Sequence, residues 1–177
     1  MERGYKLCIQ PARVEQYTDE EFITMLNLFQ RLNPMAVYIV DSWGTLCSDE
    51  IRHYAILAER YLDSHIALGY HGHNNMMQAY GSAVDFISQD IDRTLIVDAS
   101  VYGIGRGAGN LNLEVFAKYL NTVYGKNYDI LPMISVYEKY IKAIYQEQKW
   151  GYSFPYYLSA IHHCNPNYAG YYDDKLK

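Results

Sequence analysis

Short apolar runs alternate with helix-like segments along most of this chain, and this alternation restricts its fold more than any other feature. Ala36–Asp41 is a run of β-branched and aromatic residues without polar alternation, which is typical of a parallel strand covered on both faces. Comparable runs stand at residues 5–10, 65–70 and 94–102. Each run precedes a segment with the apolar spacing of a helix. We therefore predict an α/β fold of parallel strands joined by crossover helices.

The run at residues 65–70 leads directly into a His-Gly-His-Asn-Asn segment at residues 71–75. Residues two apart in an extended chain point to the same face, so His71 and His73 can reach one divalent cation together. The two asparagines can cap a helix that begins at Met76. Two histidines do not by themselves make a metal site, and the alternative is an ordinary polar loop between a strand and a helix.

A glycine-rich segment follows the last of the four runs. Residues 103–110 read Gly-Ile-Gly-Arg-Gly-Ala-Gly-Asn, and so many glycines allow a sharp turn and a close approach to a ligand. The same residues satisfy the dinucleotide-binding pattern Gly-x-Gly-x-x-Gly/Ala, with Asp129 about 20 residues further on. This alternative is disfavoured because no second strand ends at Asp129. Contact of a phosphate or CoA with backbone N–H groups near Asn110 stays open in either case.

Taken in order, these residues resemble a known enzyme family. The segment at 71–75, Asp98-Ala99-Ser100 and the glycine-rich run at 103–110 are similar to the metal-dependent aldolases and acyltransferases that include 4-hydroxy-2-oxovalerate aldolase, hydroxymethylglutaryl-CoA lyase and isopropylmalate synthase. The resemblance implies a TIM barrel with a bound divalent metal, Mn²⁺ or Mg²⁺, with Zn²⁺ as an alternative. It also implies that His71 and His73 are metal ligands and that Asn110 is a further ligand.

The predicted strand-helix units amount to half of such a barrel. A complete TIM barrel typically has about 250 residues, whereas this chain has 177. Matched to the family, the chain corresponds to the second half, so we expect a half TIM barrel over residues 1–127 and a helical extension over 128–177 that packs on it. The other half would carry an aspartate ligand, an arginine that polarises the keto acid and a histidine base. Ile91-Asp92-Arg93 is not their equivalent because it precedes its strand.

A half-barrel by itself has unpaired sheet edges and an uncovered inner face, and such surfaces favour association. Three explanations follow, in order of preference. The sequence is a fragment of a longer aldolase, it pairs with a separately encoded N-terminal half-barrel, or two copies close one barrel as a homo-oligomer.

Four polar residues stand at the C-terminal ends of predicted strands, where TIM barrels place their chemistry. Gln10, Asp41, Ser42 and Ser100 are accordingly predicted to bind substrate. A structural role is an equal alternative for Gln10 and for Asp41, whose carboxylate suits the backbone N–H groups of a turn. Asp98 shares a strand face with Ser100, and the two either orient a ligand or satisfy the barrel interior.

Tyrosine accounts for 20 of the 177 residues, and the tail is rich in it. Tyr137, Tyr140 and Tyr145 lie on a helix expected from Ile130 to Trp150, where their spacing with isoleucines indicates a packing stripe. The oxovalerate aldolases have a C-terminal tyrosine that assists proton transfer, and by this resemblance Tyr152 is the candidate catalytic residue.

For the complete barrel, the resemblance implies a carbon–carbon lyase that cleaves or forms a bond next to a 2-oxo acid such as 4-hydroxy-2-oxovalerate, by way of a metal-stabilised enolate. The partners would be a small 2-oxo acid such as pyruvate and an aldehyde or acyl-CoA. A Claisen-type acyl-CoA-dependent synthase is an alternative. Hydroxymethylglutaryl-CoA lyase is disfavoured because Tyr102-Gly103 stands where that lyase has its catalytic cysteine. The competing class is a catalytically incomplete half-barrel that serves as an assembly or interaction subunit, and we expect little aldolase activity from the 177-residue chain alone.

Composition adds bounds on partners and location. A net charge of −5, from 15 basic and 20 acidic residues, argues against binding of nucleic acid or an anionic membrane. Three widely spaced cysteines without a Cys-x-x-Cys pattern suit reduced cytosolic thiols. Neither a signal-peptide pattern nor an apolar run of about 18 residues is found. We therefore expect a cytoplasmic protein without a membrane span.

Overall fold

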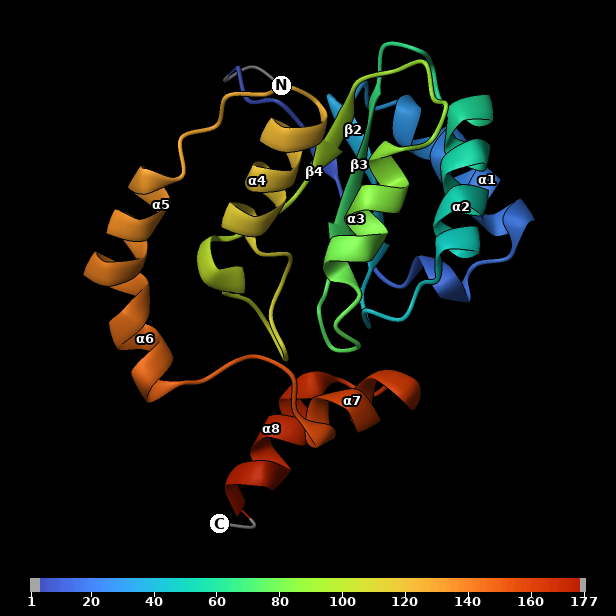
Figure 1. The fold of residues 1–177 in the computed structure, drawn as a ribbon. Coiled ribbons are helices and arrows are strands. Elements are labelled where there is room, and N and C mark those ends of the chain that lie inside the picture. The colour runs from blue at the N-terminus through green and yellow to red at the C-terminus, as the bar shows by residue number, and fades with distance from the viewer. Residues whose placement is uncertain (1–3, 176–177) are drawn as a thin grey trace. The chain divides into compact units, whose positions relative to one another are not determined.

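The computed structural model describes residues 4–175 and contains a four-stranded parallel sheet with the strand order β1-β2-β3-β4. The strands are β1 (Cys8–Ile9), β2 (Ala36–Asp41), β3 (Ala67–Gly72) and β4 (Leu95–Val97). Between successive strands the chain forms α1 (Asp19–Gln30), α2 (Ser48–Tyr61) and α3 (Ala79–Ile87), and α1 and α2 lie side by side (Figure 1). The predicted α/β fold of parallel strands and crossover helices is confirmed.

The described residues form two compact units, each of which is considered by itself. The first unit holds the sheet and comprises the residues up to Ser42, Leu46–Gly72 and Gly81–Asp98. The second comprises Trp43–Thr45, His73–Tyr80 and the residues from Ala99 onward. Its elements are η2 (Val101–Gly103), α4 (Leu113–Val123), α5 (Leu131–Val136), a π-helical turn (Tyr137–Ile141), α6 (Lys142–Glu147), α7 (Phe154–Ile161) and α8 (Pro166–Lys175). The domain boundary predicted after residue 127 stays a prediction.

The centre of the first unit is β2, in which every residue is buried. Its register with β3 pairs Ala36 with Ala67 and Tyr38 with Gly69. A Cβ atom at Gly69 would lie within 2.5 Å of three ring atoms of Tyr38, so only glycine leaves room for that ring. Alanine and tyrosine thereby share one tightly filled face of the sheet with Val40.

Helix α1 begins with a reciprocal cap. The Thr18 hydroxyl accepts a hydrogen bond from the Glu21 backbone N–H at 3.3 Å, and the Glu21 carboxylate accepts one from the Thr18 backbone N–H at 2.9 Å. These bonds to the Thr18 backbone and hydroxyl hold the pKa of Glu21 below its ordinary value of 4.5. Such a box satisfies two N–H groups that would otherwise have no partner in the helix, which explains why the helix starts at Asp19.

Other predicted boundaries are wrong by a few residues. The helix expected from Met76 starts at Ala79, since Met77 has a left-handed backbone with φ 58°. Asn74 does cap it, because its Oδ1 accepts the Ala79 N–H at 3.3 Å, but the Asn75 side chain bonds elsewhere. The single helix expected from Ile130 to Trp150 is two α-helices joined by a π-helical turn. No helix among residues 4–175 is both long and apolar enough to cross a membrane.

A candidate metal and substrate site

Side chains from four strands converge on one face of the sheet in the first unit. Ile9 pairs with Val37, so the next residue, Gln10, is level with Tyr38. Tyr70 pairs with Val97, so Asp98 is level with His71. Because side chains alternate along a strand, these four residues share a face. The parallel register thus explains why groups far apart in the sequence meet at the carboxyl ends of the strands.

Asp98 is the centre of this cluster. Its Oδ2 lies 3.0 Å from Nδ1 of His71 and accepts a hydrogen bond from Nε2 of Gln10 at 2.9 Å. The Tyr38 hydroxyl also hydrogen-bonds to this carboxylate. Burial raises the pKa of Asp98, but the bonds from His71, Gln10 and Tyr38 outweigh burial and leave that pKa below its ordinary value. Burial and the Asp98 charge together raise the pKa of Tyr38, which keeps its hydroxyl protonated as a donor.

The Asp98–His71 contact determines which imidazole nitrogen can bind a ligand. An ionised carboxylate beside Nδ1 holds the ring proton there and leaves the lone pair on Nε2. Histidines that ligate metals typically donate their other ring N–H to a carboxylate in this way. The geometry in the first unit therefore suits His71 for metal ligation.

In the second unit, the segment after β3 is tied to the glycine-rich run. His73 is buried and forms an isolated antiparallel bridge with Asn110. The Asn74 N–H donates to the Gly109 carbonyl at 2.8 Å, and Asn75 Oδ1 accepts from the Ala108 N–H at 2.9 Å. Asn75 Nδ2 also donates to the carbonyl of Trp43. The two motifs that the sequence analysis singled out are thus joined by backbone and side-chain hydrogen bonds.

The side-chain oxygen of Asn110 is a buried acceptor that the described residues leave unsatisfied. Its Oδ1 is buried and has no hydrogen-bond partner among residues 4–175, whereas its Nδ2 donates to the Ile104 carbonyl at 3.4 Å. An amide oxygen without a donor is costly to bury, and a cation would satisfy it. Within the part of the chain that the structure describes, no three His, Cys, Asp or Glu side chains group as a metal site. In the second unit, the His73 imidazole and this amide oxygen are of the types that suit part of a ligand set for a divalent transition metal.

The four predicted substrate-binding residues make internal hydrogen bonds. Asp41 is buried and its Oδ2 accepts the Leu46 N–H at 3.3 Å, in the turn after β2. Ser42 Oγ accepts the Arg13 N–H at 2.8 Å, and Ser100 Oγ donates to the Ile104 carbonyl at 2.8 Å. Gln10 bonds to Asp98 as described above. These contacts hold the strand ends in place, and substrate binding by these residues stays a prediction.

Tyr152 lines a large cavity in the second unit. The cavity has a volume of about 1040 Å³, and its wall includes Arg106, Lys149, Tyr152, Ser153 and Tyr156. The Tyr152 ring is half-exposed. The cavity is also lined by Glu147, so a phenol, two cationic side chains and one carboxylate share this space, and the cationic groups are in excess.

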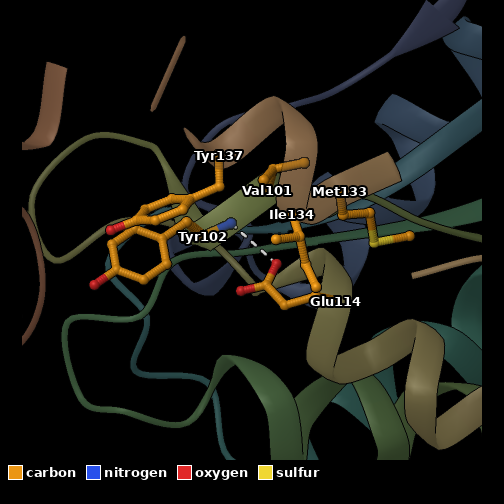
Figure 2. Close-up of a pocket in the computed structure, with 6 residues that line it drawn as sticks. All are labelled: Val101, Tyr102, Glu114, Met133, Ile134 and Tyr137. Atoms are coloured by element: carbon orange, nitrogen blue, oxygen red, sulfur yellow. Dashed lines mark hydrogen bonds between the residues drawn. The ribbon is translucent and has the colours of Figure 1, made fainter. Parts of the chain in front are cut away.

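A smaller, apolar cavity of about 230 Å³ lies beside Tyr102 (Figure 2). Its wall is formed by Val101, Tyr102, Glu114, Met133, Ile134 and Tyr137. The Tyr102 ring contacts those of Tyr137 and Tyr145, with centroids 4.6 and 5.2 Å apart. Of the predicted packing stripe, these two tyrosines pack on Tyr102, whereas Tyr140, Ile134 and Ile144 on the same helical segment are exposed.

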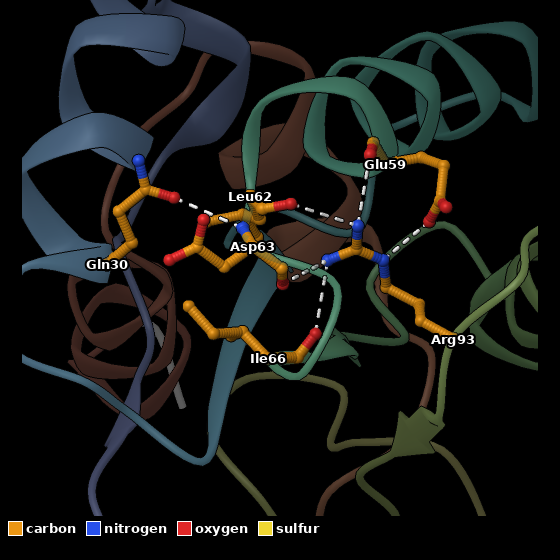
Figure 3. Close-up of polar contacts among 6 residues, drawn as sticks. All are labelled: Gln30, Glu59, Leu62, Asp63, Ile66 and Arg93. Carbon is orange, nitrogen blue, oxygen red and sulfur yellow. Dashed lines mark hydrogen bonds and ion pairs between the residues drawn. The ribbon is translucent and has the colours of Figure 1, made fainter.

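Arg93, just before β4, serves the fold of the first unit. Its side chain is 2% exposed and donates to the Glu59 carboxylate at 2.5 Å (Figure 3). It also donates to the backbone carbonyls of Glu59, Leu62 and Ile66, at 3.0 to 3.2 Å. The guanidinium thus satisfies carbonyls at the C-terminal end of α2 and in the loop that follows.

Sequence reasoning did not single out Tyr38 or Trp150 as site residues. Tyr38 could have been found from the predicted in-register pairing, which places it level with Gln10, and from the glycine opposite its ring. For Trp150 no sequence signal exists, because its contact with Tyr102 spans 48 residues.

Comparison with known proteins places these features in a family. The HMGL-like family profile matches residues 3–136. The chain is 29% identical over 141 residues to 4-hydroxy-2-oxovalerate aldolase of Bacillus thuringiensis (strain Al Hakam), which covers 79% of this chain and 40% of that protein. It is 30% identical over 139 residues to the aldolase of the same name from Bacillus cereus (strain ATCC 10987 / NRS 248), covering 78% and 39%. The chain thus spans about 40% of the length of these relatives.

Solved structures share the fold. The N-terminal domain of a candidate aldolase from Bacteroides vulgatus superposes with a TM-score of 0.81 at 24% identity, over 96% of this chain and 55% of that one. The carboxyl transferase domain of Rhizobium etli pyruvate carboxylase, solved with pyruvate, superposes with a TM-score of 0.68 at 12% identity, over 93% and 28%. The family profile, the two joined motifs and the parallel strand-helix units agree, and this chain belongs to the HMGL-like family.

Proposed function

We propose that this chain is the metal-binding half of a divalent-metal-dependent aldolase that acts on 4-hydroxy-2-oxo acids such as 4-hydroxy-2-oxovalerate. The observation that carries the proposal is the Asp98 carboxylate on Nδ1 of His71, because this partner prepares the other ring nitrogen for a metal. Relatives named 4-hydroxy-2-oxovalerate aldolase support the choice of substrate. Mn²⁺ is our first choice of metal, with Mg²⁺ and Zn²⁺ as alternatives.

In this proposal His71, His73 and Asn110 hold the metal from this chain. A divalent ion would supply positive charge beside the keto and carboxylate oxygens of a 2-oxo acid. Asp98 fixes the tautomer of His71, while Gln10 and Tyr38 fix Asp98 by hydrogen bonds. Asn110 contributes its buried oxygen atom. The chain thereby offers three neutral ligands, and its Asp98 carboxylate stands behind His71. A carboxylate ligand for the metal would come from outside these residues.

Tyr152 is proposed to transfer a proton at the bond that breaks. In retro-aldol cleavage of a 4-hydroxy-2-oxo acid, the 4-hydroxyl loses its proton as the C3–C4 bond breaks to an aldehyde, and C3 of the remaining pyruvate unit gains one. A phenol that reaches the cavity can carry a proton between such positions. Arg106 and Lys149, which share that cavity, would attract the anionic substrate.

The association of the chain belongs to the proposal too. The sheet ends at β1 and β4, and unpaired strand edges favour pairing with further strands. We propose that an N-terminal half-barrel, in the same polypeptide or a separate one, or a second copy of this chain, adds them. A cytoplasmic location is also proposed, and it rests on three cysteines that are all free and exposed.

Metal content and mass in solution test this function. The purified chain is loaded with Mn²⁺, and light scattering and bound metal are measured on the same chromatographic peak. The matched variants are His71→Ala and, as a control, His162→Ala, since His162 is exposed. We expect bound Mn²⁺ that the first variant loses and the second retains. Conversion of 4-hydroxy-2-oxovalerate to pyruvate is then assayed on the metal-loaded peak.

Equal metal content in the wild type and in His71→Ala would contradict the proposal and would favour the assembly subunit that the sequence leaves as an alternative. Loss of metal in both histidine variants would point to general destabilisation, which thermal melting of each variant identifies. The mass distinguishes a two-copy barrel from a monomer.

A further inference from the structure

The backbone of Tyr102 is held at both ends by side chains from distant parts of the second unit. Its N–H donates to Oε2 of Glu114 at 3.0 Å, as the dashed line in Figure 2 shows. Its carbonyl oxygen accepts a hydrogen bond from the Trp150 indole N–H at 2.9 Å. Three aromatic rings, those of Tyr137, Tyr145 and Trp150, surround the ring of Tyr102.

Tyr102 adopts a backbone conformation that a tyrosine does not favour. Tyr102 has φ 57° and ψ 22°, the left-handed region in which bulky residues are uncommon. Such strain persists only where the surroundings over-determine it. The two hydrogen bonds and the ring contacts of Tyr102 supply that over-determination.

Tyr102 lies next to the turn that ends in Asn110. Gly103 follows Tyr102, and its carbonyl accepts the Asn110 N–H at 3.0 Å. A Cβ atom at Gly109 would lie 2.2 Å from the Gly103 oxygen and 3.1 Å from Cδ1 of Trp150. The indole therefore bonds to the carbonyl of Tyr102 and leaves no free space for a side chain at Gly109.

We propose that Trp150 is a positioning residue that holds the glycine-rich turn so that the Asn110 side-chain oxygen stays fixed for a ligand. The role of Trp150 in the turn stands on the geometry above. Its effect on a metal rests on the proposed function, in which Asn110 is a ligand. The segment between α6 and α7 thereby becomes part of the site.

Hydrogen exchange tests the positioning role directly. Trp150→Phe keeps an aromatic ring for Tyr145, whose centroid lies 4.8 Å from that of Trp150, and removes the N–H donor. We expect the amides of Gly103 and Asn110 to exchange about tenfold faster, as loss of one hydrogen bond allows. The Leu68 amide, bonded to the Thr94 carbonyl in the first unit, serves as a reference that should not change. Tyr140→Phe, at an exposed ring in the π-helical turn before α6, is the matched control.

Unchanged exchange in the turn, or equal acceleration of the Leu68 amide, would overturn the inference. The wild-type protein offers a test that needs no variant. The Trp150 indole N–H and the Asn110 amide should show matching protection relative to their intrinsic exchange rates, because one opening exposes both. A freely exchanging indole beside a protected Asn110 amide would reject the proposal.

The affinity for Mn²⁺ separates this inference from the proposed function. We expect Trp150→Phe to weaken Mn²⁺ binding about tenfold, the scale of effects from groups that orient a ligand, while Tyr140→Phe leaves it unchanged. A loosened turn with unchanged Mn²⁺ affinity would overturn the link to Asn110. Absence of Mn²⁺ binding by the wild type would reject the proposed function, and the exchange rates would then decide the role of Trp150 alone.

Discussion

The carboxylate of Asp98 lies 3.0 Å from Nδ1 of His71, although 27 residues separate them in the chain. Asp98→Asn replaces the charge with an amide that holds the ring proton less firmly, so we expect Mn²⁺ affinity to fall about 10- to 100-fold. Equilibrium dialysis with Mn²⁺ measures the change. Asp92→Asn, at an exposed carboxylate before the same strand, should leave the affinity unchanged. Equal effects of the two substitutions would contradict the role given to Asp98.

Arg93 is expected to matter for stability and not for metal binding. Arg93→Ala leaves Glu59 and several backbone carbonyls without their donor, so the free energy of unfolding should fall by about 3 kcal/mol. Arg93→Lys should lose part of this, since an ammonium cannot reach all these acceptors. Urea unfolding measures both variants against Arg52→Ala, an exposed arginine. A loss for Arg93→Ala no larger than that for Arg52→Ala would refute the assignment.

Two glycine substitutions are expected to act in opposite directions. Gly109 has φ +92° and no room for a Cβ atom, so Gly109→Ala should destabilise the protein by about 1–3 kcal/mol. Gly81 lies in α3 with nothing within 4 Å of an added Cβ, and Gly81→Ala should stabilise by about 0.5–1 kcal/mol. Thermal melting of the two variants gives the sign. A stabilised Gly109→Ala variant would show that the turn adopts another conformation.

The cap of α1 predicts a pH dependence. The bonds from Thr18 depress the pKa of Glu21 below 4.5, so their stabilising contribution is present above the unfolded-state pKa and is lost as the pH falls through the folded-state pKa. Thr18→Ala removes the hydroxyl bond and keeps the backbone N–H bond, which is the larger cause of the lowered pKa, so the pKa of Glu21 should rise only part of the way toward 4.5 and only part of this acid sensitivity should disappear. A carboxyl-carbon NMR titration measures that pKa. Thr122→Ala, at a hydroxyl bonded within α4, should leave it unchanged, and an unshifted Glu21 pKa in Thr18→Ala would exclude the Thr18 hydroxyl bond as a cause.

The sheet could be predicted because its cause is local. A fully apolar run such as Ala36–Asp41 leaves few options other than a buried parallel strand, and parallel strands require crossovers. The helix starts were less predictable, because an asparagine can cap a helix or bond elsewhere with similar energy. Asn74 caps α3, while Asn75 binds the carbonyl of Trp43 and the N–H of Ala108.

The candidate site was predictable where it follows strand ends and hidden where it depends on distant contacts. His71 and Gln10 stand out as polar residues after apolar runs. Tyr38 reads as one more strand residue until the register with β3 is known. Trp150 donates to the carbonyl of Tyr102 across 48 residues of the chain, and no pattern along the chain encodes that contact.

The glycine opposite Tyr38 has a consequence for how this chain can change over time. A methyl group at position 69 would occupy the space of the Tyr38 ring, whose hydroxyl steadies the carboxylate behind His71. Gly69→Ala would therefore displace the Tyr38 hydroxyl from Asp98, although alanine is compatible with a strand backbone. A substitution at Gly69 would thus change the position of the Tyr38 hydroxyl on the neighbouring strand. In related sequences, we expect Gly69 to change only together with Tyr38.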